Sequence, residues 1–164
     1  VVMSPKSLLR HKEAVSTVED LAEGQFYNVL DESDDLDKTK VTRVVICSGK
    51  VYYDLRAARR TRNIDDIAII RMEQLYPFPE GDLLDVLQQY PSLKDAVWCQ
   101  EEPMNQGAWY SSQHHMRHVL QHIDPMIHLR YVGRASSAAP ACGYMSTHLE
   151  EQKQFIDEAL NTDS

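Results

Sequence analysis

The sequence has 164 residues, the size of a single domain, and its composition of 43% hydrophobic and 26% charged residues is ordinary for a globular protein. No apolar run approaches the roughly 20 residues of a membrane-spanning helix, and the first residues lack the basic-then-apolar pattern of a signal peptide. The formal net charge is −8, which repels the phosphate backbone of nucleic acids. We therefore expect neither a nucleic acid nor a membrane as a partner.

Residues 1–25 are expected to be a connector from a preceding domain, and residues 26–164 an α/β domain. The chain starts at Val1 rather than at a Met, which suggests a fragment of a longer protein. Within the connector, Thr17 and Asp20 can cap a short helix that Gly24 ends.

A short acidic stretch follows the connector. Its acids are Asp31, Glu32, Asp34, Asp35 and Asp37. We interpret it as a solvated loop. A calcium-binding loop is the alternative, although no Gly stands where an EF-hand needs its sharp turn.

From residue 41 onward, strand patterns alternate with helix patterns. Strands are predicted at 41–47, 67–71, 96–100 and 127–132. Helical spacing begins at Val51, with Arg56 and Arg60 turned outward, and the later helices are predicted at 80–90, 107–123 and 147–160. Thr147 and Glu150 form a potential capping box for the last helix. Such alternation predicts a three-layer α/β fold, with a mostly parallel sheet covered on both faces.

The three cysteines form neither a CxxC pair nor a disulfide framework. Cys47 and Cys99 lie in strand-like runs, where a reduced, buried thiol is usual. The cysteine pattern is typical of a reducing, cytosolic compartment.

Ligands of open parallel sheets gather beyond the carboxyl ends of the strands, and three loops meet that condition. In the first, Ser48-Gly49-Lys50, backbone amides could hold a phosphate. It lacks GxGxxG and the Lys-Ser/Thr of a P-loop, so a plain strand-to-helix turn is favoured.

The second loop, 101–107, carries adjacent carboxylates at Glu101 and Glu102, followed by Asn105, which can cap the next helix. Paired carboxylates could perform acid–base catalysis, but an ion pair with Arg134 or another arginine, in a structural or interface role, is favoured. The third loop, 133–137, offers Arg134 and two serines to an anion.

Three histidines, His114, His118 and His122, follow one another at i+4 spacing. Such a stripe could bind zinc, but it lies opposite the apolar stripe, so an exposed polar face is favoured. No G-x-S-x-G nucleophile motif occurs, and the residues form no complete catalytic constellation.

Several long motifs in the right order resemble the C-terminal part of the 2-oxoglutarate dehydrogenase family. They are residues 41–55 (VTRVVICSGKVYYDL), 69–79 (IIRMEQLYPFP), 98–110 (WCQEEPMNQGAWY) and 143–148 (GYMSTH). Residues 3–10 (MSPKSLLR) resemble the linker that enters that domain. The resemblance implies a Rossmann-like C-terminal domain of the transketolase superfamily.

The same resemblance implies the chemistry of the full-length enzyme. That enzyme is a homodimer of the tricarboxylic acid cycle that uses thiamine diphosphate and Mg²⁺ to decarboxylate 2-oxoglutarate and transfers succinyl to a lipoyl group of a succinyltransferase. The cofactor lies between the two preceding domains, and the Gly-Asp-Gly motif of its diphosphate site is absent here. We therefore expect no catalytic, cofactor-binding or metal-binding residue in this domain. The location would be the cytoplasm in a bacterium or the mitochondrial matrix in a eukaryote.

The residues carried over are candidates for an interface or an effector site. They are Gln74, Tyr76, Phe78, Glu101, Glu102, Asn105, Gln106, Trp109 and Arg134. Actinobacterial relatives have arginines of an acetyl-CoA site after the equivalent of Pro77-Phe78-Pro79. Here Glu80-Gly81-Asp82 would repel a phosphorylated ligand.

Two questions stay open at this stage. The apolar residues Tyr76, Phe78, Met104 and Trp109 belong either to the core or to a surface that the parent protein covers. The alternative function is a free-standing nucleotide-binding regulatory module that uses the Ser48-Gly49-Lys50 and Arg134 loops. A nucleotide such as AMP could also bind at a cleft between domains.

Overall fold

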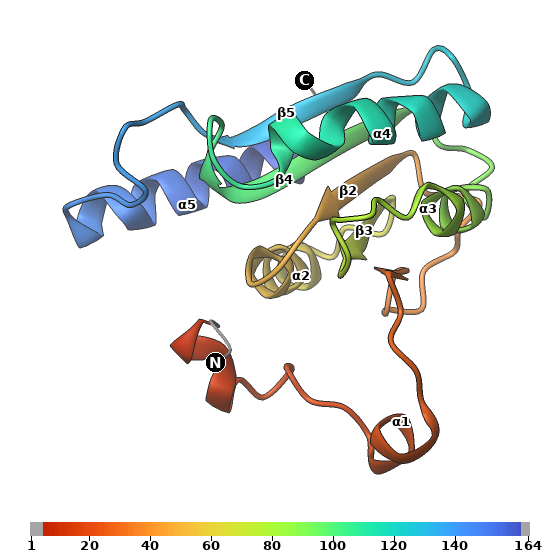
Figure 1. Ribbon diagram of the computed structural model, residues 1–164, viewed down its shortest axis with the longest axis horizontal. Helices are drawn as coiled ribbons and strands as arrows, with labels where there is room; N and C mark the ends of the chain where they lie inside the picture. Colours follow the sequence, from red (N-terminus) through yellow and green to blue (C-terminus); the bar gives the residue numbers. More distant parts are fainter. Residues whose placement is uncertain (1–4, 162–164) are drawn as a thin grey trace.

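The computed structural model describes residues 5–161 as a sheet with helices on both faces (Figure 1). The parallel strands are β2 (Arg43–Cys47), β3 (Ile67–Met72), β4 (Asp95–Pro103) and β5 (Leu129–Arg134), and the antiparallel edge strand is β1 (Val29–Leu30). Their order in the sheet is β1-β3-β2-β4-β5. The predicted mostly parallel sheet is confirmed. The two-residue strand β1 was missed because so short a segment shows no periodicity.

The four long helices form the two outer layers. Helices α2 (Val51–Arg62) and α5 (Met145–Ala159) cover one face, and α3 (Glu80–Leu87) and α4 (Trp109–Ile123) cover the other. Strands β2 and β4 are neighbours, but the chain leaves β2 toward β3 and leaves β4 toward β5. The sheet therefore has its topological switch point between β2 and β4.

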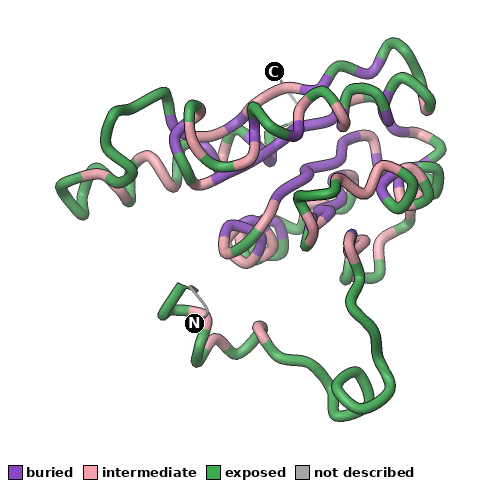
Figure 2. The backbone as a smooth tube through the Cα atoms, viewed as in Figure 1, coloured by how far each residue is buried: buried purple, intermediate pink, exposed green. Residues whose placement is uncertain are grey.

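The core lies in two layers, one on each side of the sheet. Every residue of β2 is buried (Figure 2), as expected for a central strand with helices on both faces. Cys47 and Cys99 face α2 and α5 as free thiols, and burial raises the pKa of both. Trp98 and Met116 fill the opposite layer.

Several predicted boundaries differ from the structure by two or three residues, among them the end of β4 and the start of α5. Strand β4 continues through Glu101 and Glu102, with a register irregularity between Gln100 and Pro103, because β5 keeps pairing with it as far as Arg134. Helix α5 begins at Met145, before the predicted capping box, and its N-cap Tyr144 makes no side-chain hydrogen bond.

The connector contains a short 3₁₀ helix, η1 (Lys6–Arg10), and the helix α1 (Val18–Glu23). The predicted cap is confirmed, since Thr17 and Asp20 exchange two hydrogen bonds of 3.0 Å. Residues 1–4 of the predicted connector lie outside the described residues. The division at residue 25 stays a prediction.

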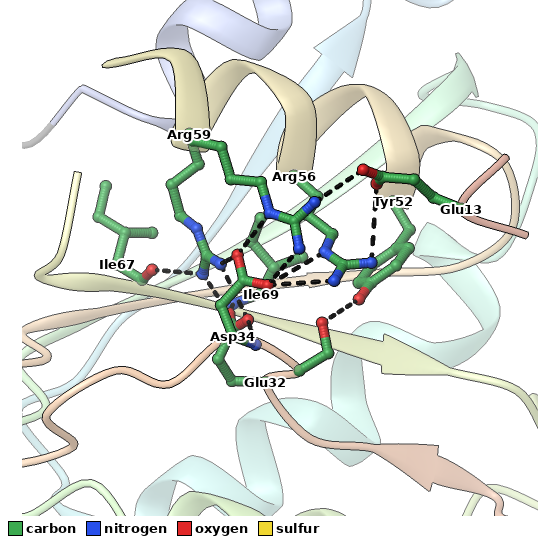
Figure 3. Close-up of polar contacts among 10 residues, drawn as sticks. Glu13, Glu32, Asp34, Tyr52, Arg56, Arg59, Ile67 and Ile69 are labelled. Atoms are coloured by element: carbon green, nitrogen blue, oxygen red, sulfur yellow. Dashed lines mark hydrogen bonds and ion pairs between the residues drawn. The ribbon is translucent and has the colours of Figure 1, made fainter. Parts of the chain in front are cut away.

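The acidic stretch is not a solvated loop, because two of its carboxylates pair with a buried guanidinium (Figure 3). Arg59 on α2 and Glu32 expose 1% and 3% of their side chains and form an ion pair. Arg59 also donates to the carbonyl oxygen of Ile67 at 3.0 Å, and Glu32 accepts from the backbone N–H of Ile69 at 2.8 Å. The pair therefore joins the acidic stretch, α2 and β3.

Two further arginines surround Asp34, which accepts from Arg59 as well. Arg56 lies 3.1 Å and Arg60 2.6 Å from its carboxylate. The prediction that both turn outward is wrong for Arg56, which exposes only 17% of its side chain. Arg60 also binds Glu13 of the connector at 2.7 Å. Pairing across more than 20 residues of sequence leaves no local pattern that could have revealed it.

Replacing Arg59 with Met should lower the free energy of unfolding by about 3–5 kcal/mol, because Glu32 would stay buried without its cation. Urea unfolding measures the loss, and adding Glu32→Gln should restore part of it. Arg62→Met is the matched control on the same helix. Its partner Asp157 is exposed, so the expected loss is below about 1 kcal/mol. Equal losses in the two single variants would contradict the assigned role of the buried pair.

The stability of the protein should depend on pH through Asp34. Hydrogen bonds from Arg60, opposed by burial and reinforced by Arg59 and Arg56, hold the pKa of Asp34 far below its ordinary range. A carboxyl whose pKa is lowered by folding stabilises the protein above its unfolded pKa, about 3.9, and loses this effect as the pH falls toward the folded pKa. The stability difference between wild type and Asp34→Asn should shrink below about pH 4.

Unfolding midpoints measured from pH 6 to pH 2 test this dependence. The exposed neighbour Asp35 supplies the control variant Asp35→Asn, which should follow the wild-type curve. A difference between wild type and Asp34→Asn that stays constant over this range would refute the assignment.

Candidate functional site

A crevice of about 410 Å³ lies at the switch point, between the carboxyl ends of β2 and β4. Ligand sites of open parallel sheets lie at this position. The first two loops singled out from the sequence meet here. The polar and charged residues that line the crevice are Ser48, Lys50, Gln100, Glu101, Glu102 and Ser111. Leu75 and Pro5 of the connector also line it.

The charge of Lys50 is neutralised inside the crevice. Its Nζ lies 2.9 Å from Asp54 and 3.1 Å from Glu101. Burial alone would lower the pKa of Lys50, but these two carboxylates outweigh it and raise the pKa. Gly49 has a φ of 74°, which favours glycine in this turn. The loop is a strand-to-helix turn whose lysine already has partners.

The expected ion pair between Glu101 and Arg134 is wrong. The carboxylate of Glu101 pairs with Lys50, while Arg134 donates from Nε to the backbone carbonyl of Glu101 at 2.9 Å. Glu102 is exposed and makes no ion pair with residues 5–161. Both carboxylates line the crevice.

Gln100 organises the second loop and was missed in the sequence. Its side chain is buried, and its Oε1 accepts from the indole N–H of Trp98 at 2.8 Å and the backbone N–H of Trp109 at 3.1 Å. Its Nε2 donates to the carbonyls of Glu102, Pro103 and Gln106, at 3.2, 3.1 and 2.8 Å. The available signal was a polar residue that ends an apolar strand.

The second and third loops are tied together by Asn105, which does not cap α4 as predicted. Asn105 donates to the carbonyl of Ser137 and accepts from its N–H, both at 3.0 Å, and Gln106 donates to the same carbonyl at 3.2 Å. The N-cap of α4 is Ala108, which makes no side-chain hydrogen bond. Side-chain hydrogen bonds therefore hold together the loops at the carboxyl ends of the parallel strands. We refer to this end of the sheet, with its loops, as the carboxyl edge.

Arg134 is buried and bound by groups from the last helix. It forms an ion pair with Glu151 and lies 3.0 Å from His148 Nδ1 and 3.2 Å from Gln152 Oε1. Its guanidinium also donates to Cys142 Sγ at 3.1 Å. None of these four partners was predicted, because they lie 8 to 18 residues from Arg134 in the sequence with no motif to link them.

The four apolar residues predicted to lie either in the core or on a covered surface differ in their burial. Tyr76 exposes 91% of its surface, whereas Trp109 is buried in the core. Phe78 and Met104 are partly buried, and the Phe78 ring stacks on His115 at 5.0 Å between centroids. Gln74 donates to the carbonyl of Pro77 at 2.8 Å and stabilises the loop that carries Tyr76.

The histidine stripe lies on an exposed face of α4, as the helical pattern predicts. His114, His118 and His122 are exposed, and His118 Nδ1 lies 3.0 Å from Glu80 of α3. Hydrogen bonds from His115 and His118 lower the pKa of Glu80. Within residues 5–161, no three acidic, histidine or cysteine side chains are placed to hold a metal ion. None of the helices in this range has the length and apolar content needed to cross a membrane.

Exposed apolar side chains gather along the carboxyl edge, while its charged groups largely pair with one another. The exposed residues are Leu75, Tyr76, Tyr110, Tyr144, Met145 and Leu149. Exposed apolar groups on one edge are typical of a surface that contacts another protein part. The arrangement suits packing better than acid–base catalysis.

Comparison with known proteins agrees with this organisation. Residues 15–160 match the family described as 2-oxoglutarate dehydrogenase C-terminal. The 2-oxoglutarate dehydrogenase E1 components of Azotobacter vinelandii and Haemophilus influenzae are 59% and 53% identical over 98% of the chain. That of Cupriavidus necator is 48% identical over 98% of the chain.

The chain spans about 17% of the length of the Azotobacter and Haemophilus proteins and 16% of the Cupriavidus protein. The family match begins inside the predicted connector and continues through α5. The chain belongs to the 2-oxoglutarate dehydrogenase C-terminal family.

Proposed function

We propose that this chain is the C-terminal domain of a 2-oxoglutarate dehydrogenase that oxidatively decarboxylates 2-oxoglutarate and transfers succinyl to a lipoyl group. The observation that carries the proposal is the 59% identity to the Azotobacter E1 component over 98% of the chain. In this proposal the full-length enzyme is a cytoplasmic homodimer that works with a lipoyl-bearing succinyltransferase.

Thiamine diphosphate and Mg²⁺ would be bound by other domains, because the crevice does not fit a diphosphate. Its lysine, Lys50, is neutralised by Asp54 and Glu101, and Glu102 adds a further negative charge at the rim. A diphosphate placed here would meet more negative than positive charge. The chemistry of the cofactor is therefore assigned to the part of the enzyme that this chain does not include.

The role proposed for this domain is to pack against the rest of the enzyme and to support its dimer. The exposed apolar groups of the carboxyl edge support this role. Gln100 fixes the loop between β4 and α4, so that the edge is preorganised for packing.

A free-standing nucleotide-binding module is the less favoured alternative. It relies on Lys50 and Arg134 as phosphate ligands, and both already have carboxylate partners. A phosphate would have to displace those partners before it could bind.

The purified 164-residue chain should not turn over 2-oxoglutarate, even with thiamine diphosphate and Mg²⁺, whereas the full-length protein should. Reduction of an artificial electron acceptor such as ferricyanide in the presence of 2-oxoglutarate measures both. Robust turnover by the chain alone would show that a catalytic site lies within it. An inactive full-length protein would contradict the proposed activity.

Replacing Gln100 with Leu should loosen the carboxyl edge, because it leaves the N–H groups of Trp98 and Trp109 and the carbonyl of Gln106 without their partner. The carbonyls of Glu102 and Pro103 keep the hydrogen bonds that they accept from Tyr131 and from the backbone of Gln106. We expect the free energy of unfolding of the chain to fall by about 3 kcal/mol. The full-length enzyme should lose activity at a lower temperature, with the turnover of the remaining folded enzyme unchanged.

Gln106→Leu provides the matched control, since this side chain makes one hydrogen bond near the surface. It should cost less than about 1.5 kcal/mol. If Gln100→Leu unfolds at the wild-type urea concentration, the organising role of Gln100 is wrong.

A further inference from the structure

Residues 15–27 are exposed without exception, although they include five large apolar side chains (Figure 2). These are Val15, Val18, Leu21, Phe26 and Tyr27. Val18 and Leu21 expose 75% and 78% of their surface on successive turns of α1. In Figure 1 this segment loops away from the sheet. We refer to residues 15–27 as the arm.

The conformation of the arm is encoded locally. Thr17 and Asp20 form a reciprocal capping box. Gly24 ends the helix where a Cβ atom would lie 2.2 Å from the carbonyl oxygen of Asp20, so only glycine fits there. Yet α1 has six residues, and isolated helices shorter than about 12 residues are marginal in water. Most helical stability comes from packing an apolar face, and among residues 5–161 no side chain buries the apolar face of α1.

Both ends of the arm are anchored to the domain. On one side, Glu13 pairs with Arg60 at 2.7 Å, and the His11 ring lies 5.0 Å from that of Tyr53. On the other side, Asn28 donates to Asp82 at 2.7 Å and accepts from the N–H of Glu73 at 2.9 Å. The arm is therefore presented from two fixed points, which lowers the entropy lost when it binds.

The charge of the arm restricts what can cover it. Glu19, Asp20 and Glu23 flank the apolar side chains, and the segment contains no Lys, Arg or His. A second copy of this chain carries a net charge of −8, and many of its arginines are paired with acids, so it would repel the arm. The complementary surface is apolar with a basic rim.

We propose that the arm docks on such a surface in the part of the same dehydrogenase polypeptide that this chain does not include. The inference rests on the proposed function. The chain spans only 17% of the Azotobacter E1 component, so most of that polypeptide is available as the partner. Burial of Val18 and Leu21 would supply the packing that α1 lacks.

Hydrogen–deuterium exchange on the 164-residue chain and on the full-length dehydrogenase tests the proposal. The amides of residues 18–23 should exchange at least about tenfold more slowly in the full-length enzyme. The double substitution Val18→Ser and Leu21→Ser in the full-length enzyme should abolish this protection. Met126→Ser is the matched control, because Met126 is also exposed, at 76%, but lies outside the arm and the carboxyl edge. It should leave the protection intact.

Two results would overturn the docking proposal. One is equally fast exchange of the arm in the chain and in the full-length enzyme. The other is protection within the 164-residue chain that grows with its concentration, together with a dimer in light scattering, which would identify a second copy as the partner. Activity is measured separately, so protection of the arm in a full-length protein without dehydrogenase activity would support docking and contradict only the proposed function.

Discussion

The buried ion pair between Arg59 and Glu32 is the constraint on which the path of the chain depends. A guanidinium with 1% of its surface exposed is costly to desolvate unless it is paired and hydrogen-bonded. Here the carboxylate of Glu32 and the carbonyl of Ile67 satisfy it, and Asp34 adds a second carboxylate. The polypeptide before the first parallel strand must therefore run along α2 and the β3 edge. That placement brings β1 to the sheet and fixes the points from which residues 15–27 leave the domain.

Ion pairs within the domain also determine which groups the carboxyl edge can offer to a ligand. In many α/β proteins this edge keeps unpaired polar groups for a ligand, but here Lys50 and Arg134 are each bound to carboxylates of their own domain. Ions satisfied in this way hold loops in place and have little capacity left to bind phosphate. Besides Glu102, which makes no ion pair with residues 5–161, the edge presents exposed apolar side chains, of which Tyr76 is the most exposed. These exposed apolar groups support the proposed role of the edge, which is to pack against the rest of the enzyme.

The fold was predictable from the sequence because it follows from short-range periodicity, whereas the site depends on long-range pairing. The apolar run 41–47 and the capping box at Thr17 are local signals. The structure confirms the cap, and it confirms a strand within the run at Arg43–Cys47. The partners of Arg59 lie 25 and 27 residues away, so the acidic stretch looked like solvated loop. Gln100 showed only that an apolar strand ends in a polar residue. Its hydrogen bonds depend on where the turn after β4 places the backbone, and that is a property of the folded loop.

The core of the domain is fully packed, whereas residues 15–27 lack the packing that their sequence calls for. In its core, propensity, hydrophobic pattern and packing agree, as they do in sequences that fold to one state. In residues 15–27 local sequence and packing disagree. The capping box and Gly24 specify a helix, but Val18 and Leu21 lack the burial that stabilises one. A linker that stays in solvent needs no fixed conformation, so it does not require a capping box or a glycine that ends a helix. Burial of the segment on the proposed docking surface would resolve this disagreement, because it would give Val18 and Leu21 the packing that the helix lacks.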